Sequence, residues 1–193
     1  MMAVMVLMFL VFFSISVFNE KVSAENCTYL LAMLLILVMT ARGIHEVYRT
    51  SNVIMLYILV ATYMTDTGAY FAGRFFGKHK LNERVSPKKT IEGSIGGYLL
   101  GALTSLGFGC AFVIPHLSFV RLCVLSAIMP LTGQIGDLAF SSVKRHFGVK
   151  DFGNIFPGHG GVFDRIDSLI FNLLVYLACA YLAAAVASGT ILY

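Results

Sequence analysis

The sequence predicts an all-α, polytopic helical membrane protein with about six transmembrane helices. Hydrophobic residues make up 58% of its 193 residues, and charged residues make up only 12%. The apolar residues fall in runs long enough to cross about 30 Å of hydrocarbon as helices. The mean hydropathy of +0.82 is too high for a soluble domain. We therefore expect a single membrane domain over residues 1–193 in a lipid bilayer.

Six apolar segments carry this prediction. They lie at residues 1–18, 28–40, 53–72, 95–114, 118–140 and 169–187. The first lacks the basic start and the cleavage site of a secretory signal peptide, so we expect it to be retained as a span. The second segment extends as far as residue 44. Asp66 interrupts the third, and the fifth carries Arg121 near its start and Asp137 near its end.

Lysine and arginine residues are distributed unequally between the two sides of these spans. Eleven of the 14 lie in segments 19–27, 73–92 and 141–168, and the other three lie in segment 42–52 and at Arg121. The positive-inside rule places the richer side in the cytoplasm. The same distribution accounts for the net charge of +4 without a nucleic-acid partner. Loops 73–92 and 141–168 are therefore predicted to share the cytoplasmic face.

Small residues recur at four-residue intervals along the fourth span. They are Gly93, Gly97, Gly101, Ser105 and Gly109. This spacing puts them in one stripe, where a second helix can approach closely. Packing within the chain is favoured, and a homodimer interface is the alternative.

Carboxylates lie at or near membrane depth in three places: at Asp66, at Asp137, and at Asp164 with Asp167. A charged side chain at the centre of a membrane helix costs about 2.5–3.5 kcal/mol on insertion scales, so such a residue is a functional candidate by default. Asp66 has a structural alternative, an ion pair with Arg74. Asp137 and Asp164 come from the adjoining ends of the fifth and sixth spans, and we expect them to converge.

Converging carboxylates without a His or Cys cluster suit a hard cation. Mg²⁺ is usually held by one or two carboxylates together with substrate phosphates, and a second cation can join it. The segment 157–161, Pro-Gly-His-Gly-Gly, offers backbone N–H groups for an anion, and Lys144, Arg145 and Lys150 add positive charge. In that segment His159 is either a general base, a phosphate donor or an ordinary loop residue. The pattern indicates phosphoryl or nucleotidyl transfer.

The second basic segment, residues 86–93, opens the fourth span. Ser86 or Thr90 is expected to cap the helix, and Pro87 suits its first turn. With Lys88 and Lys89, this helix start would attract a phosphate. A positive anchor at the membrane surface explains the two lysines equally well.

The segment 141–168 resembles the signature of the bacterial CDP-diacylglycerol synthase family, also called phosphatidate cytidylyltransferase. A serine stands two places before Lys144-Arg145, Lys150-Asp151 follows after four residues, and then come Pro157-Gly158-His159-Gly160-Gly161 and Asp164-Arg165-Ile166-Asp167. Segments 66–80 and 86–93 resemble the same family. The likeness covers about residues 60–175, which we take as the catalytic core. Members of that family usually carry more helices before the Asp66 segment than the two expected here.

The resemblance implies a multi-pass enzyme of the bacterial inner membrane that joins CTP to phosphatidic acid with Mg²⁺. Asp137 and Asp164 would bind the metal, and Ser86, Lys88 and Lys89 would belong to the substrate loop. The remaining candidates divide into catalytic residues and substrate-binding residues. Lys144, Arg145 and His159 are the catalytic candidates, and Asp66, Thr90, Lys150, Asp151, Gly158, Gly160, Gly161, Arg165 and Asp167 are the substrate-binding ones. The rival hypotheses are a CTP-dependent lipid-alcohol kinase and an ion-coupled transporter.

Overall fold

The computed structural model describes residues 2–18, 23–153, 161 and 163–188. The chain divides into two compact units, Met1–Arg42 and Gly43–Tyr193. Every site residue predicted from the sequence belongs to the second unit. The functional description below therefore concerns that unit.

The first unit consists of helix α1, Met2–Phe18, and most of helix α2, Ala24–Thr50. Its two helices are tied by a hydrogen bond in which the Cys27 thiol donates to the carbonyl oxygen of Phe12 at 3.2 Å. α1 has 17 residues and is shorter than the other helices. Among the described residues, α2 to α6 are the five helices long and apolar enough to cross a membrane. The prediction of an all-α membrane protein with six helices is confirmed.

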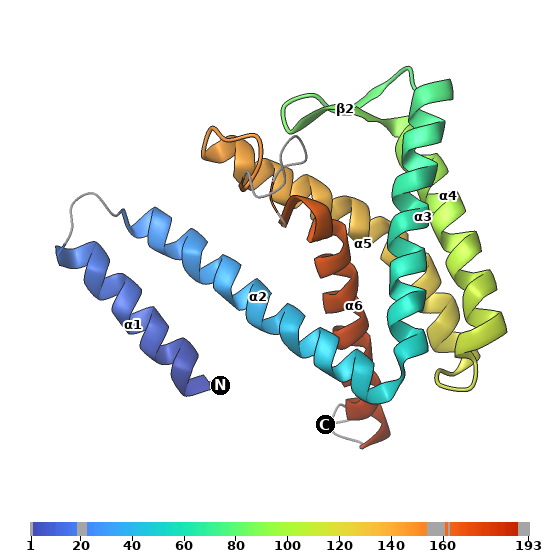
Figure 1. Cartoon of the computed structure of the whole chain (residues 1–193), viewed down its shortest axis with the longest axis horizontal. Coiled ribbons are helices and arrows are strands. Elements are labelled where there is room, and N and C mark those ends of the chain that lie inside the picture. Colours follow the sequence, from blue (N-terminus) through green and yellow to red (C-terminus); the bar gives the residue numbers. More distant parts are fainter. Residues whose placement is uncertain (1, 19–22, 154–160, 162, 189–193) are drawn as a thin grey trace. The chain divides into compact units, whose positions relative to one another are not determined.

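The second unit begins with the end of α2 and is built from four further long helices (Figure 1). They are α3 (Asn52–Phe76), α4 (Ile91–Phe108), α5 (Phe119–His146) and α6 (Phe163–Ala187). A π-helical turn, Gly109–Val113, extends α4. The connection from α3 to α4, the end of α5 and the start of α6 lie at the same end of the unit. The described parts of the two chemically rich segments therefore share one side, as the sequence predicts.

The helices extend beyond their apolar segments. α5 continues past residue 140 to His146, and its last turn holds Lys144 and Arg145. α6 begins at Phe163, with Asp164 in its first turn. Cations near a helix C-terminus and anions near an N-terminus are stabilised by the helix dipole. Residues that the sequence analysis assigned to a loop are thus held on helix ends.

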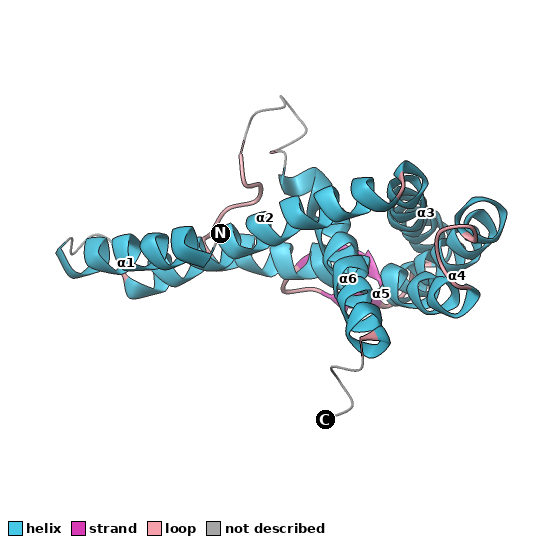
Figure 2. Cartoon of the chain, turned by 90° about the horizontal axis from the view of Figure 1, so that it is seen from below, coloured by secondary structure: helices cyan, strands magenta, loops and turns pink. Residues whose placement is uncertain are grey.

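A short β-hairpin joins α3 to α4, and the sequence analysis did not predict it (Figure 2). Strands β1 (Lys80–Asn82) and β2 (Ser86–Thr90) pair antiparallel. Ser86 and Pro87 therefore lie on a strand, and their expected place at the helix start is wrong. Thr90 is the residue that caps α4, because its hydroxyl accepts a hydrogen bond from the Gly93 N–H at 3.1 Å. Pro87 is tolerated because each strand of a two-stranded hairpin has a free edge.

Buried polar side chains fix three helices of the second unit to one another. Asn172 on α6 is fully buried. Its amide donates to the Thr62 hydroxyl on α3 at 2.9 Å and accepts from the Thr132 hydroxyl on α5 at 2.9 Å. Inside a membrane such interhelical hydrogen bonds contribute to association, because lipid tails provide no hydrophobic driving force between helices.

The small-residue stripe of α4 packs against α3. A Cβ atom added at Gly97 would lie 2.7 Å from the carbonyl oxygen of Thr65, and one added at Gly93 would lie 2.8 Å from that of Ala69. Real Cβ atoms do not approach backbone oxygens this closely, so glycine is required at both positions. The preferred interpretation, packing within the chain, is confirmed for these residues. The homodimer stays a prediction.

We expect Gly97→Ala to destabilise the protein by about 1–3 kcal/mol, because the added methyl group forces α3 and α4 apart. The matched control is Gly107→Ala on the same helix, where an added Cβ would meet nothing within 4 Å. That substitution should leave stability unchanged or raise it slightly, since alanine favours helix more than glycine does. Thermal unfolding of both variants in detergent measures the difference, and equal midpoints would contradict the packing argument.

Candidate functional site

A cavity of about 420 Å³ lies beneath the hairpin, between α3, α4 and α5. This volume is in the range of small-molecule sites. Its polar lining comes from four elements. These residues are Asp66, Tyr70 and Arg74 on α3, Lys88, Lys89 and Thr90 on β2, Ser94 on α4, and Gln134 and Asp137 on α5. The cavity thus brings together predicted site residues from three separate places in the sequence: Asp66, segment 86–93 and Asp137.

The α3 wall of the cavity follows from helical spacing. Asp66, Tyr70 and Arg74 are four residues apart, which places them on one face of a helix. Gly73 lies on the same face and leaves room for Thr90, whose hydroxyl would be 3.1 Å from a Cβ at position 73. The absence of a side chain at Gly73 therefore lets the hairpin lie close to α3.

Glu92 anchors the start of the hairpin to α4. Its carboxylate accepts hydrogen bonds from the backbone N–H groups of Lys78 and His79 at 3.1 and 3.3 Å. The same carboxylate contacts the Nδ1 atom of the His79 ring at 2.6 Å. The sequence analysis gave Glu92 no role, although an acidic residue in the first turn of a helix was a usable signal. Glu92 thus fixes the start of β1, the strand that pairs with the lysine-bearing strand β2.

Lys89 and Asp137 form an ion pair across the cavity. The Lys89 Nζ atom lies 2.5 Å from the Asp137 Oδ2 atom, and each side chain is about 30% exposed, 29% for the lysine and 31% for the aspartate. Asp66 lies near enough to be repelled by Asp137 and attracted by Lys89. Two predicted carboxylates and one predicted lysine therefore meet at this point.

Lys144 and Asp164 form a second ion pair, and this one is buried. The Lys144 Nζ atom lies 2.7 Å from the Asp164 Oδ1 atom, with side-chain exposures of 9% and 7%. The other oxygen of Asp164 accepts hydrogen bonds from the backbone N–H groups of Phe152 and Gly161, both at 2.9 Å. Asp164 therefore organises the connection between α5 and α6 as well as neutralising a lysine.

Asp167 lies one turn after Asp164 and is buried. Its Oδ1 atom accepts a hydrogen bond from the Ser168 N–H at 2.7 Å. Asp167 on α6 lies within electrostatic range of Asp137 on α5 and of Asp66 on α3. Asp164 faces its own lysine, so the pairing of Asp137 with Asp164 at a metal stays a prediction.

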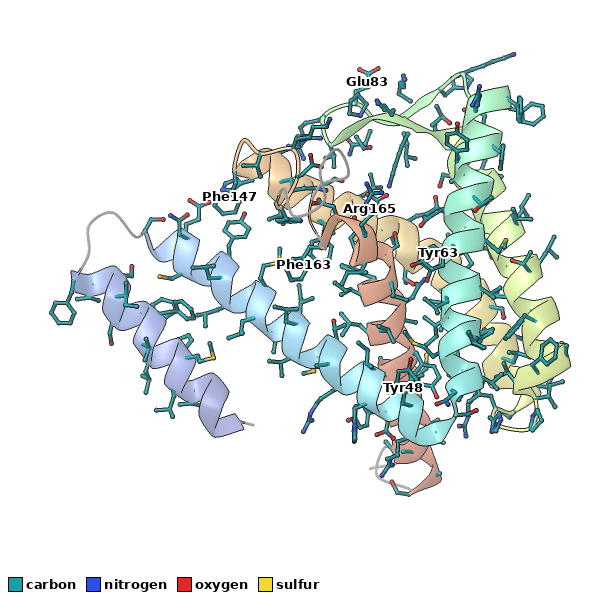
Figure 3. The ribbon with its side chains drawn as sticks, viewed as in Figure 1. Tyr48, Tyr63, Glu83, Phe147, Phe163 and Arg165 are labelled. Carbon is teal, nitrogen blue, oxygen red and sulfur yellow. The ribbon has the colours of Figure 1, made fainter. Side chains whose placement is uncertain are left out.

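The remaining predicted residues lie outside the lining of this cavity within the described part of the chain. Ser86 is half-buried on β2, and Gly161 is buried beside the turn that precedes α6. The Arg145 guanidinium is exposed and donates to the carbonyl oxygen of Val149 at 3.0 Å. Lys150, Asp151 and Arg165 are also exposed, and Figure 3 shows Arg165 at the start of α6. His159, Gly158 and Gly160 lie outside the described residues.

Two polar residues that the sequence analysis missed complete the cavity wall. The Ser94 hydroxyl donates to the side-chain oxygen of Gln134 at 2.5 Å, and the Gln134 amide donates to the Ser94 carbonyl oxygen at 3.2 Å. This reciprocal pair connects α4 to α5 beside the cavity. A glutamine inside an apolar span was the available signal, because polar side chains at membrane depth face protein or water rather than lipid.

The donor chemistry of the cavity fits a hard cation. Asp66 and Asp137 are carboxylates, the donors that Mg²⁺ prefers in proteins. Among the described residues no group of three or more His, Cys, Asp or Glu side chains is arranged as a complete metal site. Mg²⁺ commonly takes few protein ligands and completes its shell with water and phosphate oxygens. The cavity therefore suits an ion that arrives with a phosphate-bearing ligand.

Comparison with known proteins adds a family. The profile of the Cytidylyltransferase family matches residues 1–183. A protein of Staphylococcus epidermidis named phosphatidate cytidylyltransferase is 47% identical over 134 residues, which cover 68% of this chain and 51% of the relative. A protein of Staphylococcus haemolyticus with the same name is 48% identical over 119 residues, covering 62% of this chain and 45% of the relative. The chain spans about half the length of the curated relatives it matches.

Proposed function

The chain belongs to the cytidylyltransferase family, and from this premise we propose that it transfers CMP from CTP to phosphatidic acid. The products would be CDP-diacylglycerol and pyrophosphate. The observation that carries the proposal is the cavity in which the carboxylates of Asp66 and Asp137 face Lys88 and Lys89 at the end of membrane-spanning helices. A phosphate-bearing nucleotide and a lipid can meet only at such a boundary.

The proposed reaction is an in-line displacement. An oxygen of the lipid phosphate forms a bond to the α-phosphorus of CTP, and the bond from that phosphorus to the bridging oxygen of the β-phosphate breaks. The electron pair leaves with pyrophosphate. The protein has little covalent work in such a reaction and acts by positioning and by offsetting charge. Lys88 and Lys89 line the cavity and can neutralise phosphate oxygens there.

A Mg²⁺ ion, when bound, would supply further positive charge at the phosphates. We propose Asp137 as its first carboxylate ligand, with Asp164 as the second by family resemblance and a second cation as an option. Lys89 pairs with Asp137 in this structure. Its ammonium group also lines the cavity and can neutralise a phosphate oxygen there.

The protein is a multi-pass membrane protein, and we propose that it lies in the bacterial inner membrane with the cavity facing the cytoplasm. The basic hairpin and the basic α5–α6 connection support this orientation, because cytoplasmic loops carry the excess of Lys and Arg. CTP is present on that side. The family favours the transferase over the lipid-alcohol kinase and the transporter.

The proposal is tested with purified protein, phosphatidic acid, Mg²⁺ and CTP labelled either in the cytosine or in the γ-phosphate. We expect the cytosine label to appear in lipid and the γ-phosphate label to appear in pyrophosphate. In parallel, diacylglycerol replaces phosphatidic acid as the acceptor, and it should remain unlabelled. Transfer of the γ-phosphate to diacylglycerol would identify a kinase, and no labelled lipid in either reaction would refute the proposed transfer.

A further inference from the structure

The cavity holds three cations, and only one of them is neutralised by a contact with a carboxylate. Lys89 is paired with Asp137. Lys88 and Arg74 also line the cavity, and no ion pair joins either of them to a carboxylate in the part of the chain that the structure describes. Two cationic groups from different elements are thus available to phosphates. The proposed reaction brings together two phosphate-bearing substrates, so the cations can be divided between them.

Arg74 is held in position by Tyr70. The Arg74 Nη1 atom donates to the Tyr70 hydroxyl at 2.8 Å, and the guanidinium carbon lies 6.0 Å from the centre of the tyrosine ring. A guanidinium group has five N–H donors in a fixed plane. The contact with Tyr70 uses one of the two terminal nitrogens and leaves donors for a second partner. A pre-oriented guanidinium is suited to bidentate binding of a phosphate.

The surroundings of Arg74 differ from those of the lysines. Arg74 is in the last turn of α3, and the aromatic side chains of Tyr70, Phe71, Phe75 and Phe76 on the same helix end are 50–70% exposed. Tyrosine is enriched at the level of the lipid head groups, and exposed phenylalanine side chains next to it favour contact with lipid. Lys88 is carried by the hairpin, which extends sideways from the ends of α3 and α4 (Figure 1). We therefore infer that Arg74 lies toward the lipid, while Lys88 belongs to an element outside the membrane-spanning helices.

We propose that Arg74, oriented by Tyr70, binds the phosphate of the lipid substrate, and that the lysines of the hairpin bind the phosphates of the nucleotide. The identity of the lipid as a phosphate monoester rests on the proposed function. The binding role of Arg74 rests on its position in the cavity, its contact with Tyr70 and the neighbouring aromatic residues. Arg74 is thereby assigned to lipid recognition and not to an ion pair with Asp66.

The first test measures binding and needs no CTP. Purified protein is titrated with mixed micelles containing phosphatidic acid, and with micelles containing phosphatidylcholine alone to correct for non-specific uptake. We expect Arg74→Gln to weaken phosphatidic acid binding about 10- to 100-fold, the range for a lost charge-assisted contact. Arg84→Gln is the matched control, because Arg84 is an exposed cation in the hairpin turn and is not part of the cavity lining. It should bind like the wild type.

The second test separates the two substrates kinetically. Arg74→Gln should raise the KM for phosphatidic acid about 10- to 100-fold and change the KM for CTP by less than about twofold. Tyr70→Phe keeps the ring and removes the hydroxyl, so it should raise the KM for the lipid by a smaller factor. Arg74→Lys keeps the positive charge but lacks the planar guanidinium group. Its KM for phosphatidic acid should therefore lie between those of Arg74→Gln and the wild type.

The outcomes distinguish this inference from the proposed function. Wild-type protein that binds phosphatidic acid through Arg74 but makes no cytidine-bearing lipid would refute the function alone. Active protein in which Arg74→Gln raises only the KM for CTP would overturn the inference alone, as would unchanged lipid binding. If Arg74→Gln fails to fold, phosphatidic acid binding is measured for Arg74→Lys and Tyr70→Phe instead. Wild-type affinity for phosphatidic acid in both variants would overturn the inference.

Discussion

Replacing Asp137 by asparagine is expected to lower cytidylyl transfer by at least about 100-fold and to leave the stability of the protein nearly unchanged. The activity should fall because Asp137 is the cavity carboxylate proposed to hold Mg²⁺, and losing one pre-organised electrostatic contact in an active site typically costs about 10²- to 10³-fold. Stability should persist because the Lys89–Asp137 pair is about one-third exposed, 29% and 31% for its two side chains. Exposed ion pairs contribute only about 0–1 kcal/mol.

The measurement combines the radiolabel assay with thermal unfolding in detergent. Direct titration with Mn²⁺, followed by electron paramagnetic resonance, adds a readout that does not depend on turnover, and the Asp137→Asn variant should bind the ion more weakly. Glu83→Gln is the control, because Glu83 is an exposed carboxylate at the hairpin tip (Figure 3). Normal transfer in Asp137→Asn would remove the central argument for this cavity as the site.

Replacing Asp164 by asparagine is expected to affect both activity and stability. Lys144 would remain buried with its charge no longer neutralised, and removing one partner of a buried pair typically costs about 3–5 kcal/mol. The substitution also weakens the carboxylate contacts to the N–H groups of Phe152 and Gly161. We therefore expect a lower thermal midpoint, faster proteolysis between α5 and α6, and loss of transfer.

A double variant separates the two effects of Asp164. In Asp164→Asn with Lys144→Met, both charges of the buried pair are gone, and such replacements are often neutral or stabilising. We expect the thermal midpoint to return toward that of the wild type while transfer remains absent, because the proposed metal ligand Asp164 and the catalytic candidate Lys144 are both missing. Recovery of transfer together with stability would show that Asp164 serves only to neutralise Lys144 and order the connection.

Hydrophobic patterning predicted the helices well and their ends poorly. The six apolar segments appear as six helices, because each run is long enough to satisfy all its backbone groups internally. The prediction ended α5 near residue 140 and began α6 near residue 169, whereas the helices continue through charged residues to His146 and from Phe163. Hydropathy records where a chain is apolar. A helix can extend beyond its apolar residues when the charged residues at its ends form ion pairs or hydrogen bonds.

The hairpin and the carboxylate partners could not be read from the sequence. β1 has only three residues, and the pairing of Lys80 with Thr90 depends on Glu92 holding the strand start. Resemblance assigned Asp137 and Asp164 to one metal, which stays a prediction, and the folded chain pairs each of them with its own lysine. Helix packing determines which lysine contacts which carboxylate. The local sequence does not predict that packing. Asp66, Lys88 and Lys89, which the sequence analysis singled out from separate segments, line the same cavity.

The contact between α3 and α4 restricts how the protein can admit its substrates. At Gly93 and Gly97 the two backbones lie so close that no side chain fits between them. We therefore expect these two walls of the cavity to move together. Widening of the cavity to admit a nucleotide would then come from displacement of the hairpin or of α5.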